Sequence, residues 1–316
     1  MGKYLLRRLL AMTVSLLGVT IVVFLLIRCI PGTIVEQMLG TEALTSYETV
    51  ESLRRYFGLD QPLHVQYAHW IRRVAVGDLG KSWRMGMPVL AFILSRLAVT
   101  VELACIAILV AALIGVPTGI VSALRQNRPA DNLARMAALF GLSIPVFWQG
   151  TMLILVFSLA FRWAPPIEWV SPAVNLRANL EMMLLPGFCL GTASAAVIMR
   201  MTRSCMLDVL RQEYIRTARA KGLAERSVVG IHGLKNALIP VVTVTGLQMG
   251  YLLGGTVVVE EVFGLPGLGR LVLWAIFQRD YPTVQGTVLF IAVMFMLVNL
   301  VVDILYAYLD PRIRRG

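Results

Sequence analysis

The segment that most resembles a catalytic motif is the run Ala75-Val76-Gly77-Asp78-Leu79-Gly80-Lys81-Ser82. Glycines followed by lysine and serine are typical of phosphate-binding loops, in which backbone amides surround the phosphates and the lysine binds their charge. Here Ala75 occupies the position of the first glycine, and no apolar strand precedes the run. The sequence therefore predicts that this chain holds no nucleotide.

Residues that bind metals or act as nucleophiles are few and scattered. His64 and His69 are five positions apart and would form a weak metal site, and none of the four cysteines has CxxC spacing. Neither an HExxH nor a GxSxG motif occurs. We therefore predict no catalytic residue, no metal and no cofactor, and we expect the chain not to be an enzyme.

A basic segment at 200–235 has the strongest potential for recognition. Arg216, Arg219 and Lys221 cannot enter lipid, Ala218 and Ala220 are small, and Gly222 follows where a helix would end. Such a short helix could dock into a groove on a partner protein. From the residues alone, a solvated basic loop or one that binds lipid headgroups is an equal alternative.

The composition indicates that lipid surrounds the elements that carry this segment. The chain has 316 residues, of which 58% are hydrophobic and 15% charged, and its mean hydropathy is +0.75. A soluble domain of this length would need more charge on its surface. The net charge of +11 lies mostly at the edges of apolar runs, where it sets topology, so we expect no nucleic-acid partner.

Six apolar stretches are long enough to cross a bilayer as helices, which predicts an all-α polytopic membrane protein. They are Leu9–Ile27, Leu97–Ala123, Ala134–Phe161, Met182–Met199, Ala237–Val259 and Val284–Leu309. The first could be a cleavable signal peptide, but it is long and lacks a small-x-small cleavage site, so an uncleaved span is favoured. Pro145 and Pro240 lie inside the third and fifth stretches, where neighbouring helices can satisfy the freed backbone groups.

Basic residues in alternate connections predict the orientation. They cluster before the first span, between the second and third, at 200–235 and at the end of the chain, which places both termini in the cytoplasm. The expected organisation is a terminus with the first span (1–30), an extracytoplasmic cap loop (31–96), the permease spans (97–309) and a tail (310–316). Helices are expected in the cap from about Thr45 and over His64–Val76.

Several motifs together resemble the permeases of ABC importers, in the dipeptide, oligopeptide and nickel branch. The first is Glu213-Tyr214-Ile215-Arg216-Thr217-Ala218-Arg219-Ala220-Lys221-Gly222, followed by His232-Gly233-Leu234-Lys235-Asn236-Ala237-Leu238-Ile239-Pro240, which resembles the family's EAA loop. Others are Gly77-Asp78-Leu79-Gly80-Lys81-Ser82, Pro266-Gly267-Leu268-Gly269 and Arg279-Asp280-Tyr281-Pro282. The resemblance covers nearly the whole chain and is closest to the first permease subunit, which has a long loop after its first helix.

This resemblance implies a coupling helix at about 200–240 that docks onto a cytoplasmic ATPase. The implied coupling residues are Glu213, Arg216, Thr217, Ala218, Ala220, Lys221 and Gly222. The chain departs from the general pattern, because Arg216-Thr217-Ala218 replaces Glu-Ala-Ala and the spacing to Pro240 is longer. The implied partners are a second permease subunit, two ATPases and a periplasmic or lipid-anchored solute-binding protein, in the bacterial inner membrane. Peptides are the expected substrate, with glutathione, nickel or another small solute as alternatives.

Polar residues inside the apolar runs are the candidates for the translocation path. They are Thr243, Gln248, Tyr251 and Asn299, while Glu260 and Glu261 are candidates for an outer gate. Gly246, Gly250 and Gly254 share a helix face and favour close packing over a substrate path. An ion-coupled carrier or a channel is the remote alternative, but it would carry more buried charges and internal repeats.

Overall fold

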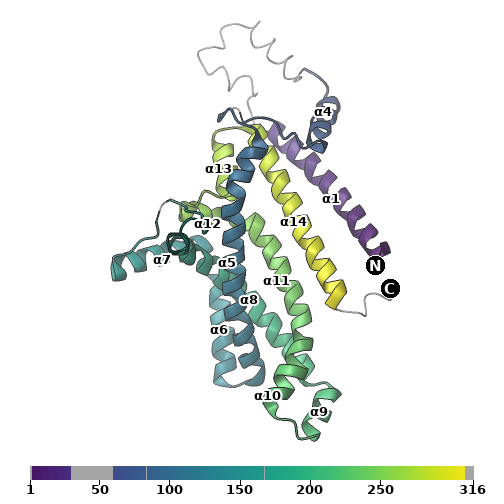
Figure 1. The fold of residues 1–316 in the computed structure, drawn as a ribbon, viewed down its shortest axis with the longest axis vertical. Coiled ribbons are helices and arrows are strands. Elements are labelled where there is room, and N and C mark those ends of the chain that lie inside the picture. Colours follow the sequence, from purple (N-terminus) through teal and green to yellow (C-terminus); the bar gives the residue numbers. More distant parts are fainter. Residues whose placement is uncertain (1, 30–59, 83, 167, 310–316) are drawn as a thin grey trace. The chain divides into compact units, whose positions relative to one another are not determined.

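The computed structural model describes residues 2–29, 60–82, 84–166 and 168–309. In these ranges the regular structure is helical, apart from one isolated β-bridge between Lys81 and Pro88 (Figure 1). The expected all-α fold is therefore confirmed. The helix predicted from Thr45 lies outside the described residues, whereas the one predicted over His64–Val76 is present as α4, Leu63–Ala75.

The chain forms two compact units. The first comprises Met1–Leu97 and Arg270–Val293, and the second comprises Ala98–Gly269 and Met294–Gly316. The first unit contains α1 (Gly2–Cys29), α4, the start of α5 (Val89–Leu124), most of α13 (Leu268–Phe277) and the start of α14 (Tyr281–Leu309). The second contains α6 (Pro129–Ser143), α7 (Val146–Phe161), α8 (Leu176–Leu210), α9 (Glu213–Ala220), α10 (Glu225–Ser227), η1 (Val228–Leu234), α11 (Lys235–Gly255) and α12 (Val257–Val262).

Within the described residues, five helical segments are long and apolar enough to cross a membrane: α1, α5, α8, the α10–η1–α11 segment and α14. Helices α6 and α7 provide a sixth span if the pair is counted as one. The predicted boundary between cap and second span, at residue 96, falls inside α5, because that helix already begins at Val89. The fifth predicted span divides, since α11 ends at Gly255 and α12 follows.

The third predicted span is sharply bent. Helices α6 and α7 meet at 101° across Ile144 and Pro145. Proline disfavours the helical conformation at the residue before it, and here Ile144 adopts extended angles (φ −77°, ψ 123°). A continuous helix over Ala134–Phe161 was therefore the wrong expectation.

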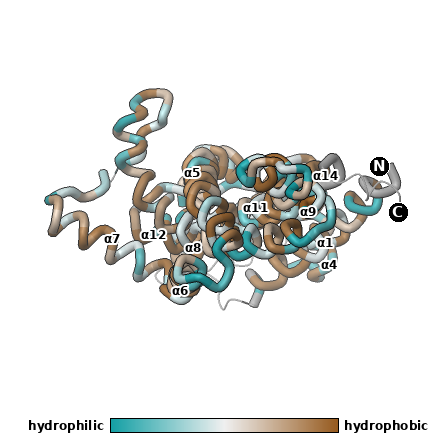
Figure 2. Tube along the Cα trace, turned by 90° about the horizontal axis from the view of Figure 1, so that it is seen from below, coloured by the Kyte–Doolittle hydropathy of each residue, from teal (hydrophilic) through white to brown (hydrophobic). Residues whose placement is uncertain are grey.

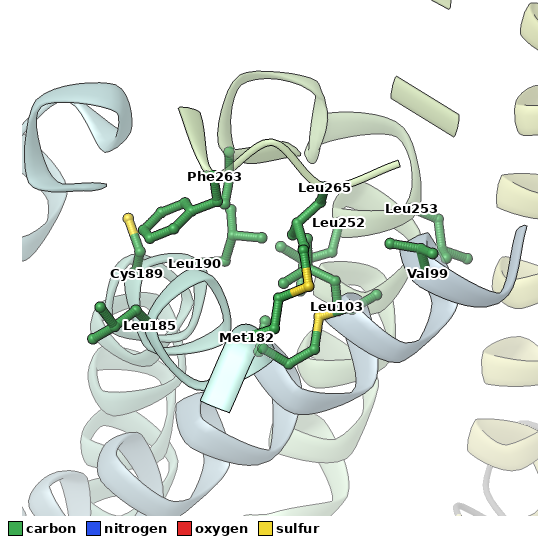
Figure 3. Packing of buried hydrophobic residues seen from close by; sticks show 14 residues of the cluster. Val99, Leu103, Met182, Leu185, Cys189, Leu190, Leu252, Leu253, Phe263 and Leu265 are labelled. Carbon is green, nitrogen blue, oxygen red and sulfur yellow. The ribbon is translucent and has the colours of Figure 1, made fainter. Parts of the chain in front are cut away.

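Helix α8 forms the core of the second unit, and most of its apolar window is buried. Met182, Leu185 and Leu190 pack with Leu103 of α5 and Phe263 in one buried cluster (Figure 3). Hydrophobic residues predominate along the spans, as the brown stretches of α5 and α7 in Figure 2 show, and many of their side chains are exposed. Such exposure suits a lipid environment.

Glycines let α5 and α8 approach closely. A methyl group built on Gly115 or Gly119 of α5 would come within 3 Å of α8 atoms, and one on Gly187 or Gly191 of α8 would come as near to α5. Each helix thus carries two glycines four residues apart, at the spacing that permits close helix packing in membranes.

Candidate functional site: the coupling segment and a membrane cavity

The segment after α8 is more regular than the sequence indicated. Helix α8 continues to Leu210, so the expected loop from about residue 200 begins only at Arg211. Helix α9 then runs from Glu213 to Ala220, and Gly222 follows with φ +78°. This left-handed conformation is the one that glycine adopts readily at a helix end. The predicted short helix and its terminal glycine are both present.

One face of α9 is buried within the chain itself. Ile215 is fully buried and Ala218 is 8% exposed, and both pack on Val228 at the start of η1. Ala218 therefore lies on the inner face of α9 and is not available for close approach by a partner. The burial of Ile215 and Ala218, three residues apart, follows the helical period.

The opposite surface of α9 and its C-terminal turn is exposed, and six of the seven residues predicted for coupling lie on it. They are Glu213, Arg216, Thr217, Ala220, Lys221 and Gly222. Arg216 donates a hydrogen bond to Glu213 Oε1 at 2.8 Å, but both side chains remain mostly exposed. We call this set the coupling surface.

Polar contacts attach both ends of α9 to the next helices. At one end, Asn236 of α11 donates from Nδ2 to the Tyr214 hydroxyl oxygen at 3.0 Å and to the His232 carbonyl at 3.1 Å. At the other end, Arg219 donates two hydrogen bonds to Glu225, at 2.7 and 3.1 Å. These bonds raise the pKa of the Arg219 guanidinium, so it stays charged.

The π-helix η1 connects α9 to α11, and sequence reasoning missed it. Residues 228–234 have helical backbone angles and continue into α11 without a break at Lys235. Single turns of π-helix are rare and frequently occur at functional sites. Gly230 and Gly233 lie within it, but two glycines are no specific signal for this conformation.

A cavity of about 470 Å³ brings together two of the four candidate path residues. Gln248 and Tyr251 of α11 line it, together with Ser194 of α8 and apolar residues from α6, α7, α8, α11 and α12. It lies beside the bend at Pro145, because Leu142 before the bend and Val146 and Phe147 after it are among its walls. Among the described residues, no charged side chain lines it. Sequence reasoning did not select Ser194, whose only signal is a small hydroxyl in an apolar run.

The other two path candidates lie outside this cavity. Thr243 donates its hydroxyl to the Ile239 carbonyl within α11 at 3.3 Å. The Asn299 side chain packs where Gly250 of α11 leaves space, and its buried Oδ1 accepts no hydrogen bond from the described residues. A methyl group on Gly246 would come within 2.2 Å of Val302, so close packing of α11 on α14 accounts for these glycines.

The two candidate gate residues face different surroundings. Glu260 is fully buried, and its Oε1 accepts hydrogen bonds from Thr100 and Thr256, each at 2.8 Å. Thr100 in turn accepts from the Leu268 backbone amide at 2.8 Å. Glu261 is exposed. Glu260 thus joins α5, α12 and the turn before α13.

Two family profiles together match nearly the whole chain. The inner membrane component of binding-protein-dependent transport systems matches residues 115–315, and the N-terminal part of such membrane components matches residues 1–104. The chain belongs to this family. It is a multi-pass membrane permease of an ABC importer, in the dipeptide branch, and ATP hydrolysis in such importers is performed by separate subunits.

Relatives of this permease align over its full length. The dipeptide transport system permease protein DppB of Alkalihalophilus pseudofirmus is 42% identical, covering 99% of this chain and 100% of the relative. The glutathione transport system permease protein GsiC of Salmonella typhimurium is 43% identical, covering 99% of each. Each of these relatives therefore aligns with essentially the whole permease, without a missing or additional domain.

Solved structures with the same fold are more distant in sequence. A subunit of the inward-facing MetNI methionine ABC transporter aligns with a TM-score of 0.56 and 17% identity, over 69% of the permease and 96% of that chain. An amino acid ABC transporter crystallised with histidines gives a TM-score of 0.52 and 16% identity, over 71% and 94%. The permease therefore has the fold of ABC-importer membrane subunits.

Proposed function

We propose that this permease imports short peptides, as one of two membrane subunits that work with two cytoplasmic ATPases and a solute-binding protein. The full-length similarity to a dipeptide permease and a glutathione permease supports this class of substrate, because glutathione is itself a small peptide. Both termini lie in the cytoplasm in this proposal, as the distribution of basic connections predicts, and α9 is then on the side of the ATPases.

The observation that carries the proposal is the attachment of the coupling surface to a helix that lines the cavity. Ile215 and Ala218 pack on η1, and Tyr214 bonds Asn236 at the start of α11. The same α11 places Gln248 and Tyr251 in the cavity. A displacement of α9 by an ATPase would therefore be transmitted to α11 through these side-chain contacts.

ATP can act on this permease only by favouring one of its conformations. A ligand shifts a conformational equilibrium by its difference in affinity for the two states. The ATPases supply that difference in affinity if their ATP-bound, closed form fits the coupling surface in only one position of α9. The exposed Glu213, Arg216 and Lys221 provide charges that such a partner can recognise.

The cavity suits the passage of varied peptides because the described residues that line it carry no fixed charge. Gln248, Tyr251 and Ser194 can exchange hydrogen bonds with peptide amides, while the other walls are apolar. The charged termini of a peptide find no counter-ion here, so the cavity would hold peptides weakly and release them readily. Selection among peptides then belongs to the solute-binding protein.

The proposal is tested by reconstituting the complete importer in liposomes and measuring uptake of a labelled dipeptide and of glutathione. We expect uptake to require ATP, both permease subunits and the binding protein. Uptake of only one compound would assign the substrate. Equal uptake by liposomes that contain this permease without ATPases would overturn the proposal.

A pair of variants at Gly222 tests the coupling segment. Gly222 needs a left-handed backbone, yet a methyl group there would contact nothing within 4 Å, so substitution acts through the backbone alone. We expect Gly222→Val to lower ATP-driven uptake at least several-fold, while Gly222→Asn, which tolerates this conformation, retains most of it. Equal uptake by both variants, with ATPase association intact, would exclude α9 as the coupling element.

Charge variants at Gln248 test the path. We expect Gln248→Glu to slow the uptake of peptides with acidic side chains relative to that of peptides with basic ones, and Gln248→Lys to do the reverse. The quantity compared is the ratio of these two uptake rates. Gln126→Glu, on an exposed connection, is the matched control and should leave the ratio unchanged. If this ratio changed equally in all three variants, the cavity would not be part of the translocation path, although peptide import itself would not be contradicted.

A further inference from the structure

An aromatic clasp between α1 and α4 fixes the depth of α4 in the first unit. We define the clasp as Thr20 and Phe24 of α1 with Tyr67 and Trp70 of α4. The hydroxyl oxygens of Thr20 and Tyr67 are 2.8 Å apart, and the Phe24 ring centroid lies 5.2 Å from that of Tyr67 and 5.8 Å from that of Trp70. Thr20 and Phe24 are each only 2% exposed.

The clasp lies at the end of the first apolar span. That span covers Leu6–Leu26, so at 1.5 Å per residue Thr20 lies about 9 Å and Phe24 about 3 Å inside its end. Arg28 lies just beyond the end, with its guanidinium 3.4 Å from the Phe24 ring centroid, and it donates a hydrogen bond to Gln66 of α4 at 2.7 Å. Tyr67 and Trp70 therefore lie at the edge of the hydrocarbon layer, where these residue types concentrate in membrane proteins.

Two polar residues of α4 lie beside the clasp along the helix axis but face away from α1. His69 and Arg72 are one and two residues from Trp70, so along the axis of α4 they lie within about 3 Å of it. Both are exposed, and their spacing of three places them on one face. Arg73 differs, because it bonds Asp78 at 2.9 Å, whereas Arg72 forms no hydrogen bond or ion pair within the described residues.

We propose that His69 and Arg72 bind the phosphate of a membrane lipid in the headgroup layer where α1 leaves the bilayer. The Arg72 guanidinium supplies a permanent positive charge and several donors that match phosphate oxygens, and the His69 imidazole supplies a further N–H. The ligand is an anionic phospholipid, whose net charge attracts basic side chains at the surface. With the N-terminus in the cytoplasm this lipid belongs to the outer leaflet. The inference is independent of which solute the permease carries.

Fluorescence quenching tests the depth. The full-length permease is assembled with its partner subunits in lipid nanodiscs, with its native cysteines replaced by alanine and a bimane dye on Arg72→Cys. We expect a nitroxide on the lipid headgroup to quench this dye several-fold more strongly than aqueous iodide does. Dominant quenching by iodide would show that this face of α4 points to water or to a soluble partner, and would overturn the proposal.

Lipid dependence tests the binding. In nanodiscs of phosphatidylcholine with increasing phosphatidylglycerol, we expect the melting temperature of the parent permease to rise with the anionic fraction. The His69→Ala/Arg72→Ala variant should lose most of this rise, whereas Arg125→Ala, which removes an exposed charge from the connection after α5, should retain it. An equal rise in all three proteins would also overturn the proposal.

Discussion

The Ser82 hydroxyl donates a hydrogen bond to Asp280 Oδ2, which joins residues 198 positions apart in the first unit. Thr283 donates to the same oxygen at 2.8 Å, and all three side chains are almost fully buried. Ser82 closes the Gly77–Ser82 motif, and Asp280 belongs to the Arg279–Pro282 motif at the start of α14. The contact explains why two segments so distant in sequence each need a polar residue.

We expect Ser82→Ala to destabilise the permease by about 1.5–3 kcal/mol, the usual cost for a buried hydrogen bond to a charged acceptor. Thr283→Val should cost a similar amount. Because both hydroxyls share one oxygen, the double variant should deviate from additivity. Thermal unfolding of the three variants in nanodiscs measures this. Additive effects would show that the two hydroxyls contribute independently of each other.

The glycines between α5 and α8 provide a second prediction. A methyl group on Gly191 would lie 2.6 Å from Val110 and 2.9 Å from the Ala107 carbonyl oxygen, and backbone cannot move aside cheaply. We expect Gly191→Ala to cost about 1–3 kcal/mol of stability through overpacking. Gly18→Ala in α1 is the matched control, because nothing lies within 4 Å of a methyl group there. It should be neutral or slightly stabilising, and a loss of stability equal to that of Gly191→Ala would refute the packing argument.

The sequence could predict the spans because apolar length is a property of each segment alone. It could not predict the bend at Pro145, since whether a proline kinks a helix or ends it depends on the packing around it. Similarly, Gln248 and Tyr251 share a helix face and were predictable as neighbours, but their meeting with Ser194 of α8 depends on tertiary contacts. Ala218 appeared suited to a partner by its size, yet its position beside Ile215 on the buried face turns it inward.

A buried ion pair yields a third prediction. Asp131 is fully buried and accepts two hydrogen bonds from Arg203, each at 2.8 Å, and one from Ser122 at 2.6 Å. Arg203→Met leaves this carboxylate uncompensated, so we expect a loss of about 3–5 kcal/mol. The Asp131→Asn/Arg203→Met double variant should recover part of it, as measured by thermal unfolding. Arg177→Ala, which breaks the exposed pair with Glu181, should cost about 1 kcal/mol or less.

A variant at Glu260 can distinguish a structural role of this residue from a role in gating. In Glu260→Gln the side-chain oxygen can still accept from Thr100 and Thr256, so we expect a modest loss of stability and near-normal uptake. Gly267→Ala should be worse, because its methyl group would lie 2.3 Å from the Glu260 carboxylate. Thermal unfolding and peptide uptake are measured together. If Glu260→Gln abolished uptake at unchanged stability, the charge itself would be required for gating.

The link between α9 and η1 should control coupling more than ATPase binding. Ile215→Ala removes the side chain that packs on Val228, and truncation of a fully buried isoleucine costs about 2–5 kcal/mol in most proteins. The coupling surface itself is left unchanged, so the ATPases should still associate, yet a loosened α9 would move without α11. We therefore expect ATP hydrolysis to continue while uptake per ATP falls several-fold.

Arg216→Ala should do the reverse, since it alters the exposed surface and leaves the Ile215 contact intact, so ATPase association should weaken while transport per hydrolysed ATP is retained. The two variants are compared by co-purification of the ATPases and by the ratio of peptide taken up to phosphate released. The same ratio in both variants would mean that η1 does not transmit the motion of α9 to α11.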